Sequence, residues 1–248
     1  MTPLSPQKTP PVQGARDFLR DALHLARANV RTLLLLATAL IFVLLLEEVA
    51  EGEIMQLDVY AYRFFVQTLR SEGVTPIMEG FTSLAALPVV IVTTCVIAAL
   101  APGKAPGWCV CANLVGAVAL NQVLKYLIQR PRPDGFRLAT EVGYSFPSGH
   151  SMVSMAFYGL IIWMIWRYHK RDIMRLVWCA VFGLIIVMVG ISRIYLGVHY
   201  ASDVIAGFCV STVWLVFYTK IVAPAFMSRF ADEASEQSPL TPGDPASL

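Results

Sequence analysis

Two histidines and one carboxylate have the residue types and the spacing that nucleophilic catalysis requires. His199 precedes Asp203 by four residues, a spacing that places an imidazole and a carboxylate on the same face of a helix. The carboxylate can then accept one ring N–H and leave the other nitrogen free as a nucleophile. His150 is available as a general acid that protonates a departing oxygen. The alternative, a buried structural His–Asp pair, would leave the neighbouring cations without a purpose.

Three cations accompany these histidines, namely Lys125, Arg132 and Arg193. Together they match a phosphate in charge and donor geometry better than they match a carboxylate. Transfer of a phosphoryl group needs mainly positioning and charge stabilisation, and such residues can supply both without a metal. The loops that carry them contain no acidic cluster suited to magnesium, so we expect neither a metal nor a cofactor at this site.

The stretch Pro147-Ser148-Gly149-His150 is expected to begin a helix. Pro147 interrupts the preceding segment, Ser148 is a favoured N-cap, and Gly149 lets backbone come close to a ligand. The first turn of a helix has unpaired N–H groups and the positive end of the macrodipole, which favour a bound anion. His150 would then stand beside that anion. Taken alone, an ordinary capped helix with an incidental histidine is an equally good interpretation of this stretch.

The composition indicates a membrane protein. Of the 248 residues, 56% are hydrophobic and 15% are charged, and the mean hydropathy is +0.62. These values are too apolar for an ordinary soluble domain. The net charge of +2 gives no reason to expect nucleic-acid binding. The cysteines lie in apolar segments and are interpreted as small core residues rather than disulfide partners; they are Cys95, Cys109, Cys111, Cys179 and Cys209.

Hydropathy predicts an all-α fold, a six-span transmembrane helix bundle with an amphipathic interfacial helix after the first span. The interfacial segment extends to about residue 81 and mixes aromatic with charged side chains, as is usual at a membrane surface. Residues 15–30 are expected to form a further helix along that surface. The membrane domain is predicted over 15–223, between disordered cytoplasmic tails at 1–14 and 224–248. The expected spans are 32–49, 84–100, 108–128, 147–166, 176–191 and 200–222.

Six spans place both termini on one side of the membrane. Basic residues concentrate there, in the segments 16–31, 167–175 and 220–229, and by the positive-inside rule this side is cytoplasmic. The loops around 130–150 and 192–199 then face outward together, and their arginines are better explained by a binding site than by topology. Uninterrupted spans and the absence of a targeting peptide favour a multi-pass protein of a bacterial inner membrane, with its site on the extracytoplasmic side.

Three motifs resemble the signature of the type 2 phosphatidic acid phosphatases, a family that shares a core with the vanadium haloperoxidases. The motifs are Lys125-x6-Arg132-Pro133, Pro147-Ser148-Gly149-His150 and Ser192-Arg193-x5-His199-x3-Asp203, and they match in identity, order and spacing. The doubled Arg130-Pro131-Arg132-Pro133 is ambiguous: spacing favours Arg132 as the phosphate ligand and leaves Arg130 an assisting role. The signature does not cover the first 120 residues, which could contribute to substrate choice.

The resemblance implies a phosphohistidine mechanism. In that mechanism His199 attacks phosphorus, Asp203 orients it and His150 protonates the leaving group, after which water releases inorganic phosphate. The residues implied to hold the phosphate oxygens are Lys125, Arg132, Ser148, Gly149, Ser192 and Arg193.

The leading hypothesis is a metal-independent lipid phosphatase that acts at the outer membrane face on phosphatidic acid, phosphatidylglycerol phosphate or a polyprenyl diphosphate. Its partners would be the lipid phosphate and the bilayer, and the sequence does not reveal the oligomeric state. A lipid phosphotransferase would use the same site but release no free phosphate. A vanadium haloperoxidase shares the core but resembles soluble chains. A non-enzymatic lipid-phosphate binding or transport protein would be expected to show broken helices or internal repeats, and would leave the paired histidines without a role.

Overall fold

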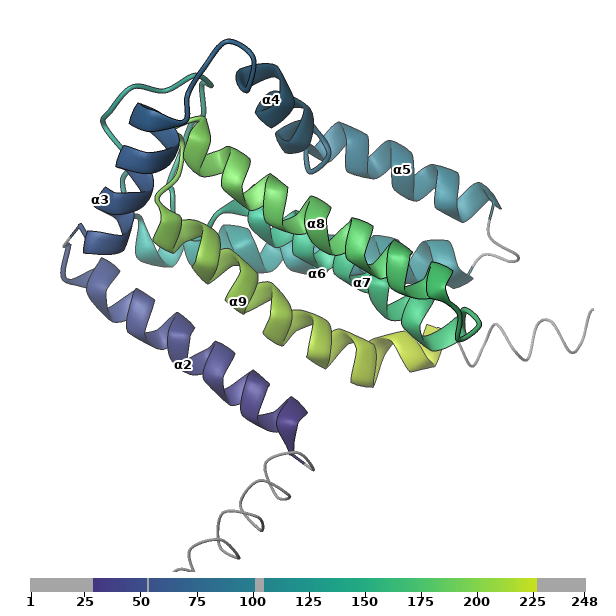
Figure 1. Cartoon of the computed structure of the whole chain (residues 1–248). Coiled ribbons are helices and arrows are strands. Elements are labelled where there is room, and N and C mark those ends of the chain that lie inside the picture. The colour runs from purple at the N-terminus through teal and green to yellow at the C-terminus, as the bar shows by residue number, and fades with distance from the viewer. Residues whose placement is uncertain (1–28, 53, 101–104, 227–248) are drawn as a thin grey trace, which may run out of the picture.

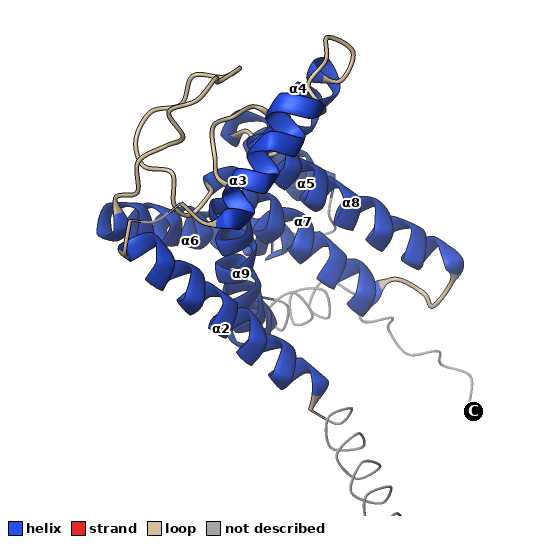
Figure 2. Cartoon of the chain, turned by 60° about the vertical axis from the view of Figure 1, so that its left-hand side comes forward, coloured by secondary structure: helices blue, strands red, loops and turns tan. Residues whose placement is uncertain are grey.

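The computed structural model describes residues 29–52, 54–100 and 105–226 (Figure 1). Within these residues the regular elements are all helical and are joined by loops (Figure 2). The predicted surface helix at 15–30 and the predicted tails lie almost entirely outside them. In chain order the elements are α2 Val30–Ala50, α3 Gln56–Tyr62, the π-helical η1 Arg63–Thr68, α4 Thr75–Ser83, α5 Leu87–Leu100, α6 Ala105–Ile128, α7 Gly149–Tyr168, α8 Ile173–Tyr195, α9 Ala201–Phe217 and the π-helical η2 Tyr218–Val222.

The described helices confirm the predicted all-α membrane bundle. Five of them are long and apolar enough to cross a membrane, and there are six crossings if the bent pair α4 and α5 forms one span. The last crossing continues from α9 through η2 to Phe226. It therefore runs slightly beyond residue 223, at which the sequence pattern places the end of the membrane domain.

The second predicted span, 84–100, begins three residues later in the structure. Helix α5 begins only at Leu87 and has 14 residues, while α4 ends at Ser83, and the two helices meet at a bend of 52°. Pro88 lies in the first turn of α5, where proline is tolerated because the N–H that it lacks would have no partner within the helix. The proline thus marks the start of α5, just inside the span that hydropathy predicts.

Helix α7 lies at the centre of the bundle. It packs against α6, α8 and α9, while α2 packs against α9 and α5 against α6 (Figure 1). Between these helices the core is apolar, with Val110, Phe157 and Leu160 almost completely buried. The outer faces carry many exposed large apolar side chains, and only 6% of the α2 span is buried. Such outer surfaces are suited to contact with lipid rather than water.

One end of the bundle collects the loops that carry the sequence motifs. The loop 129–148 between α6 and α7 and the turn 196–200 between α8 and α9 meet at this end, beside α3 (Figure 1). The N–H of Leu138 donates to the carbonyl oxygen of Leu196 at 2.9 Å, which joins the loop to the turn. These contacts bring residues that are distant in the sequence into one region.

The segment predicted as an amphipathic interfacial helix with a connector, after the first span, comprises three elements, α3, η1 and α4. Asp58 in α3 does not lie on a solvated polar face, as an amphipathic surface helix would require. The residue is 3% exposed, and its carboxylate accepts hydrogen bonds from the first turn of α9. Helix α3 is therefore packed into the bundle through a buried carboxylate.

Candidate active site

The start of α7 is fixed against the first turn of α9. Ser148 is the N-cap of α7, and its hydroxyl oxygen accepts the N–H of Ser151 at 3.5 Å. The N–H of Ser148 donates to the carbonyl oxygen of Asp203 at 3.0 Å. A Cβ atom at Gly207 would lie 3.0 Å from the carbonyl oxygen of Ser148, so the two helices approach closely only because this residue is glycine. The N-terminus of α7, where an anion is expected to bind, and the His199–Asp203 pair are thereby held in one rigid unit.

His199 lies in the turn before α9, and Asp203 lies in the first turn of that helix. Asp203 Oδ2 accepts the N–H of Tyr200 at 2.9 Å and lies 3.3 Å from His199 Nδ1. On the other side of the ring, Arg132 Nη1 lies 3.2 Å from Nε2. Because a guanidinium can only donate, Nε2 must accept this hydrogen bond, and the ring proton belongs on Nδ1, which donates to Asp203. The lone pair of the imidazole is therefore on Nε2.

The protonation state of His199 suits a nucleophile. Burial lowers the pKa of His199 to about 4, and it outweighs the hydrogen bond and charge of Asp203, which raise the pKa. The positive charges of Arg193 and Arg132 lower it further. The imidazole is therefore neutral near pH 7, and only the neutral ring has a lone pair with which to attack.

A pocket of 310 Å³ opens beside His199. Its wall is formed by the end of α6, the loop 129–148, the start of α7 and the turn before α9. Five of the predicted site residues line it, namely Lys125, Arg132, Gly149, His150 and His199. The other four, Ser148, Ser192, Arg193 and Asp203, are buried behind this wall. The structure thus gathers all of the predicted residues at one end of the bundle and separates a lining group from a supporting group.

Backbone carbonyls hold the two lining cations in place. Lys125 Nζ donates to the carbonyl oxygen of Tyr144 at 2.5 Å. Arg132 donates to three carbonyl oxygens at 3.0 to 3.2 Å, those of Val142, Gly143 and Val198. Cations that are already oriented need little rearrangement when an anion binds.

Ser192 does not face the pocket. Its hydroxyl donates to the carbonyl oxygen of Val189 at 2.7 Å, within α8, and its side chain is completely buried. The hydroxyl of Ser192 is therefore bonded within its own helix, and the residue does not line the pocket.

Glu141 is a site residue that the sequence motifs do not include. It lines the pocket, accepts a hydrogen bond from Arg193 Nη2, and places Oε2 3.9 Å from Arg132 Nη2. Burial disfavours the charged carboxylate, but the charge and hydrogen bond of Arg193 outweigh burial and lower the pKa of Glu141. A carboxylate thus lies against two of the arginines that the motifs assign to phosphate. The sequence does not distinguish Glu141 from Asp134, the other acidic residue of this loop, whose side chain is exposed.

The lining is suited to an anion rather than to a cation. Among the described residues, no group of three or more His, Cys, Asp or Glu side chains is arranged to hold a metal ion. A neutral imidazole and two fixed cations can instead bind a phosphate and transfer it to nitrogen.

The segment that contains the site matches a known protein family. Residues 106–227, from the start of α6 to the end of the last span, match the family described as the PAP2 superfamily. The chain belongs to this superfamily. The matched segment contains every predicted site residue, whereas α2 to α5 precede it.

Several curated proteins are similar to this PAP2 segment. Phosphatidylglycerophosphatase B of Bacillus subtilis is 43% identical over 95 residues, which cover 36% of the chain and 44% of the relative. Lipid A 1-phosphatase of Rhizobium johnstonii is 34% identical over 113 residues, 42% of the chain and 42% of the relative. Undecaprenyl-diphosphatase of Sulfolobus acidocaldarius is 31% identical over 112 residues, 42% of the chain and 49% of the relative. The chain thus spans less than half the length of these relatives.

Two solved structures resemble the PAP2 chain over most of its length. The transmembrane PAP2 type phosphatidylglycerolphosphate phosphatase from Bacillus subtilis superposes with a TM-score of 0.64 at 27% identity, covering 79% of this chain and 96% of that one. Aquifex aeolicus LpxE superposes with a TM-score of 0.55 at 20% identity, covering 68% of this chain and 98% of that one. This second likeness shows a similar fold and nothing more. Together with its apolar helices, the first likeness makes the chain a multi-pass membrane protein.

The structure separates the two arginines of the doubled motif. Arg132 lines the pocket, as the motif spacing favours, whereas Arg130 does not. Arg130 Nη1 donates to Asp203 Oδ1 at 2.6 Å, and Nη2 donates to Asp58 Oδ2 at 3.0 Å. Arg130 therefore contacts the carboxylate behind the histidine and does not line the pocket. Asp58 lies outside the PAP2 segment, and no local pattern in the sequence indicates this contact.

Proposed function

We propose that this PAP2 protein is a metal-independent membrane lipid phosphatase that works through a phosphohistidine intermediate. The observation that carries the proposal is the state of His199, whose proton is held on Nδ1 by Asp203 while its Nε2 lone pair lies beside a cation-lined pocket. This arrangement pairs a nucleophile with its orienting group, next to a site for an anion.

The proposed reaction has two steps. First, His199 Nε2 forms a bond to phosphorus while the bond from phosphorus to the leaving oxygen breaks, and His150 gives that oxygen a proton. Asp203 stabilises the positive charge that develops on the ring, and Lys125 and Arg132 balance the charge on the phosphate oxygens. In the second step His150 takes a proton from water, the water oxygen attacks phosphorus, and the P–N bond breaks to release inorganic phosphate.

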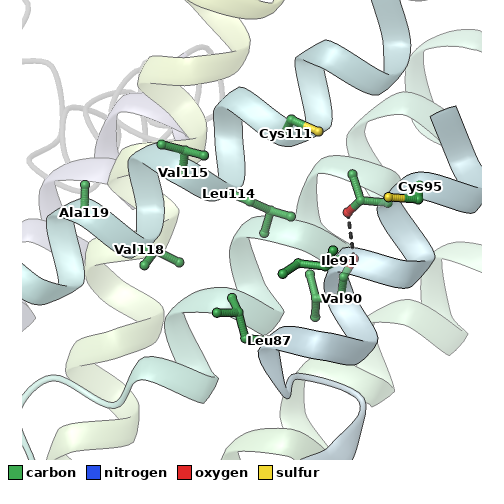
Figure 3. Close-up of a pocket in the computed structure, with 10 residues that line it drawn as sticks. Leu87, Val90, Ile91, Cys95, Cys111, Leu114, Val115, Val118 and Ala119 are labelled. Atoms are coloured by element: carbon green, nitrogen blue, oxygen red, sulfur yellow. Dashed lines mark hydrogen bonds between the residues drawn. The ribbon is translucent and has the colours of Figure 1, made fainter.

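An apolar cavity near the polar pocket supports a lipid substrate. This cavity of 480 Å³ lies between α5 and α6, and Figure 3 shows side chains such as Leu87 and Leu114 that line it from the two helices. Ala119 lines the apolar cavity and Gln122 lines the polar pocket, so the two are about one turn apart along α6. A phosphate in the pocket can therefore be attached to a hydrocarbon chain in the cavity or in adjacent lipid.

The relatives suggest which lipid phosphates to test. Their names refer to phosphatidylglycerol phosphate, lipid A and undecaprenyl diphosphate. We propose phosphatidylglycerol phosphate, phosphatidic acid or a polyprenyl diphosphate as the substrate, at the extracytoplasmic side of a bacterial inner membrane. The orientation is supported by Arg167, Arg171 and Arg175, which gather at the turn between α7 and α8, at the other end of the bundle from the pocket (Figure 1).

The test is phosphate release by the purified protein in detergent from phosphatidylglycerol phosphate, phosphatidic acid and a polyprenyl diphosphate in parallel. His199→Ala should abolish release, whereas His169→Ala, the same change at an exposed turn, should leave it intact. Equal release by the folded His199→Ala variant would overturn the proposed nucleophile. Transfer of labelled phosphate to an acceptor lipid, without free phosphate, would instead identify a phosphotransferase.

A further inference from the structure

Arg130 lies between two buried carboxylates at the end of the bundle that contains the pocket. It pairs with Asp58 at 3.0 Å and with Asp203 at 2.6 Å, and both carboxylate side chains are completely buried. The side chain of Arg130 itself is 7% exposed and stacks on the ring of Tyr200, with 4.1 Å between the guanidinium carbon and the ring centroid. Two negative charges and one positive charge thus share an enclosed space directly behind His199.

Asp58 is held in this position by the first turn of α9. Its Oδ1 accepts the backbone N–H of Ser202 at 2.8 Å, and its Oδ2 accepts the Ser202 hydroxyl at 2.7 Å. The Ser202 oxygen in turn accepts a hydrogen bond from Arg130 Nη1 at 2.7 Å. Both oxygens of the carboxylate therefore have hydrogen-bond partners that fix its orientation, unlike those of a loosely placed surface charge.

The charge balance of this group determines what Asp203 can do. An arginine paired with Asp203 alone would cancel the negative charge that His199 needs when its ring becomes positive during attack. Because Asp58 is also paired to Arg130, the three side chains of Asp58, Arg130 and Asp203 together keep a net charge of −1. Asp203, which faces the imidazole, can then carry that negative charge. Asp58 thereby preserves the charge of Asp203 without touching His199.

We propose that Asp58 is a positioning residue for phosphoryl transfer, which neutralises Arg130 so that Asp203 remains a full carboxylate partner of His199. This inference rests on the proposed function. It also gives the chain before the PAP2 segment a part in the chemistry, because Asp58 belongs to α3 and the family match begins at residue 106.

A second contact joins α3 to the pocket loop. The Tyr62 hydroxyl oxygen accepts the N–H of Phe136 at 3.2 Å. Helix α3 therefore fixes the loop that carries Arg132 as well as the carboxylate group behind His199. If α3 only supported the loop mechanically, the Tyr62 contact would be explained. Such a role would not require a charged residue at position 58.

The experiment compares Asp58→Asn with the double variant Asp58→Asn/Arg130→Gln. Asparagine can keep its amide oxygen as the acceptor for the Ser202 N–H, and its NH₂ then replaces the oxygen that accepts from Arg130. The negative charge and the hydrogen bond to Arg130 are both lost, so Arg130 is left paired with Asp203 alone. We expect kcat for lipid phosphate hydrolysis to fall about tenfold or more, with KM within about threefold, because the cations that line the pocket are unchanged. In the double variant the excess positive charge is gone, and kcat should recover at least about fivefold over Asp58→Asn.

The matched control is Asp134→Asn, the same change at a fully exposed carboxylate in the loop 129–148, which should leave kcat unchanged. Thermal unfolding in detergent reports the folded fraction of each variant. A folded Asp58→Asn with kcat within about threefold of the unsubstituted protein would overturn the inference. So would a double variant that is folded but no more active than Asp58→Asn, since that result assigns Asp58 a purely structural role.

Two further results distinguish failure of this inference from failure of the proposed function. If Asp58→Asn does not fold, the test rests on the double variant. The inference then requires that the double variant keep kcat within about tenfold of the unsubstituted protein. If the unsubstituted protein releases phosphate and His199→Ala does not, the proposed function holds whatever the Asp58 variants show. Failure of phosphate release by the unsubstituted protein itself would remove the proposed function first.

Discussion

Asp203→Asn tests the proposed nucleophile directly, because it alters hydrogen-bonding roles and hardly alters volume. Arg130 donates to Asp203 Oδ1 at 2.6 Å, and Oδ2 accepts from His199 Nδ1 at 3.3 Å. In the variant the amide oxygen must face Arg130, since a guanidinium and an amide NH₂ are both donors. The amide NH₂ then faces His199 and requires Nδ1 to accept, so the ring proton moves to Nε2.

The expected effect on turnover is large. A protonated Nε2 has no lone pair with which to attack phosphorus, and it also confronts the Arg132 donor that lies 3.2 Å away. In a Ser-His-Asp triad the corresponding change lowers kcat about 10⁴-fold by fixing the wrong tautomer. We expect a fall of roughly 10³- to 10⁴-fold here, which corresponds to about 4 to 5 kcal/mol in the barrier. Loss of the Tyr200 cap should cost about 1 kcal/mol of stability, too little to explain such an effect.

The assay is phosphate release by the purified variant in detergent, with thermal unfolding of the same sample. The matched control is Asp172→Asn, at the N-cap of α8, where the carboxylate accepts the N–H of Arg175 at 3.0 Å. Asparagine caps helices as well as aspartate does, so this variant should keep both its stability and its kcat. A folded Asp203→Asn with kcat within about tenfold of the unsubstituted protein would refute the tautomer argument.

Three other perturbations have defined outcomes. Because burial lowers the pKa of His199 to about 4 from an ordinary value of 6.5, the unfolded chain binds this proton first as the pH falls. Stability in detergent should therefore decrease between about pH 6.5 and 4, by up to about 3 kcal/mol, and the decrease should be smaller in His199→Asn. Glu141→Gln should bind inorganic phosphate several-fold more tightly, as measured by product inhibition, because the carboxylate no longer competes for Arg193; an unchanged inhibition constant would contradict that competition. Activity should survive EDTA, and a magnesium requirement would count against the cationic site.

The fold and the short-range parts of the site could be predicted because they depend on local rules. Apolar runs long enough to cross a bilayer must be helices, and this requirement gave five of the crossings at nearly their observed bounds. The His199–Asp203 pair is four residues apart, and the cap at Ser148 lies within its own first turn. The later start of the second span follows from Pro88, a signal that hydropathy averages hide.

The supporting contacts could not be predicted because the pairs that form them are distant in the chain. Arg130 and Asp58 are separated by 72 positions, and Arg193 and Glu141 by 52. No periodicity relates such residues, and an acidic side chain in an amphipathic segment is more often solvated than buried. The contacts of Asp58 are therefore visible only in the structure, where α3 lies beside the first turn of α9.

The two neighbouring arginines show how a short motif can serve two separate charges. Pro131 and Pro133 fix their own φ angles near −65° and disfavour helix at the residues before them, which keeps the stretch close to a polyproline conformation. In a β-strand, residues two apart share a face, whereas in a polyproline helix with three residues per turn their side chains diverge by about 120°. Arg130 accordingly reaches Asp203 behind the site, and Arg132 lines the pocket in front of it. The alternation of arginine and proline thus places one guanidinium on each side of the nucleophile, which a pair of arginines on one helical or extended face could not do.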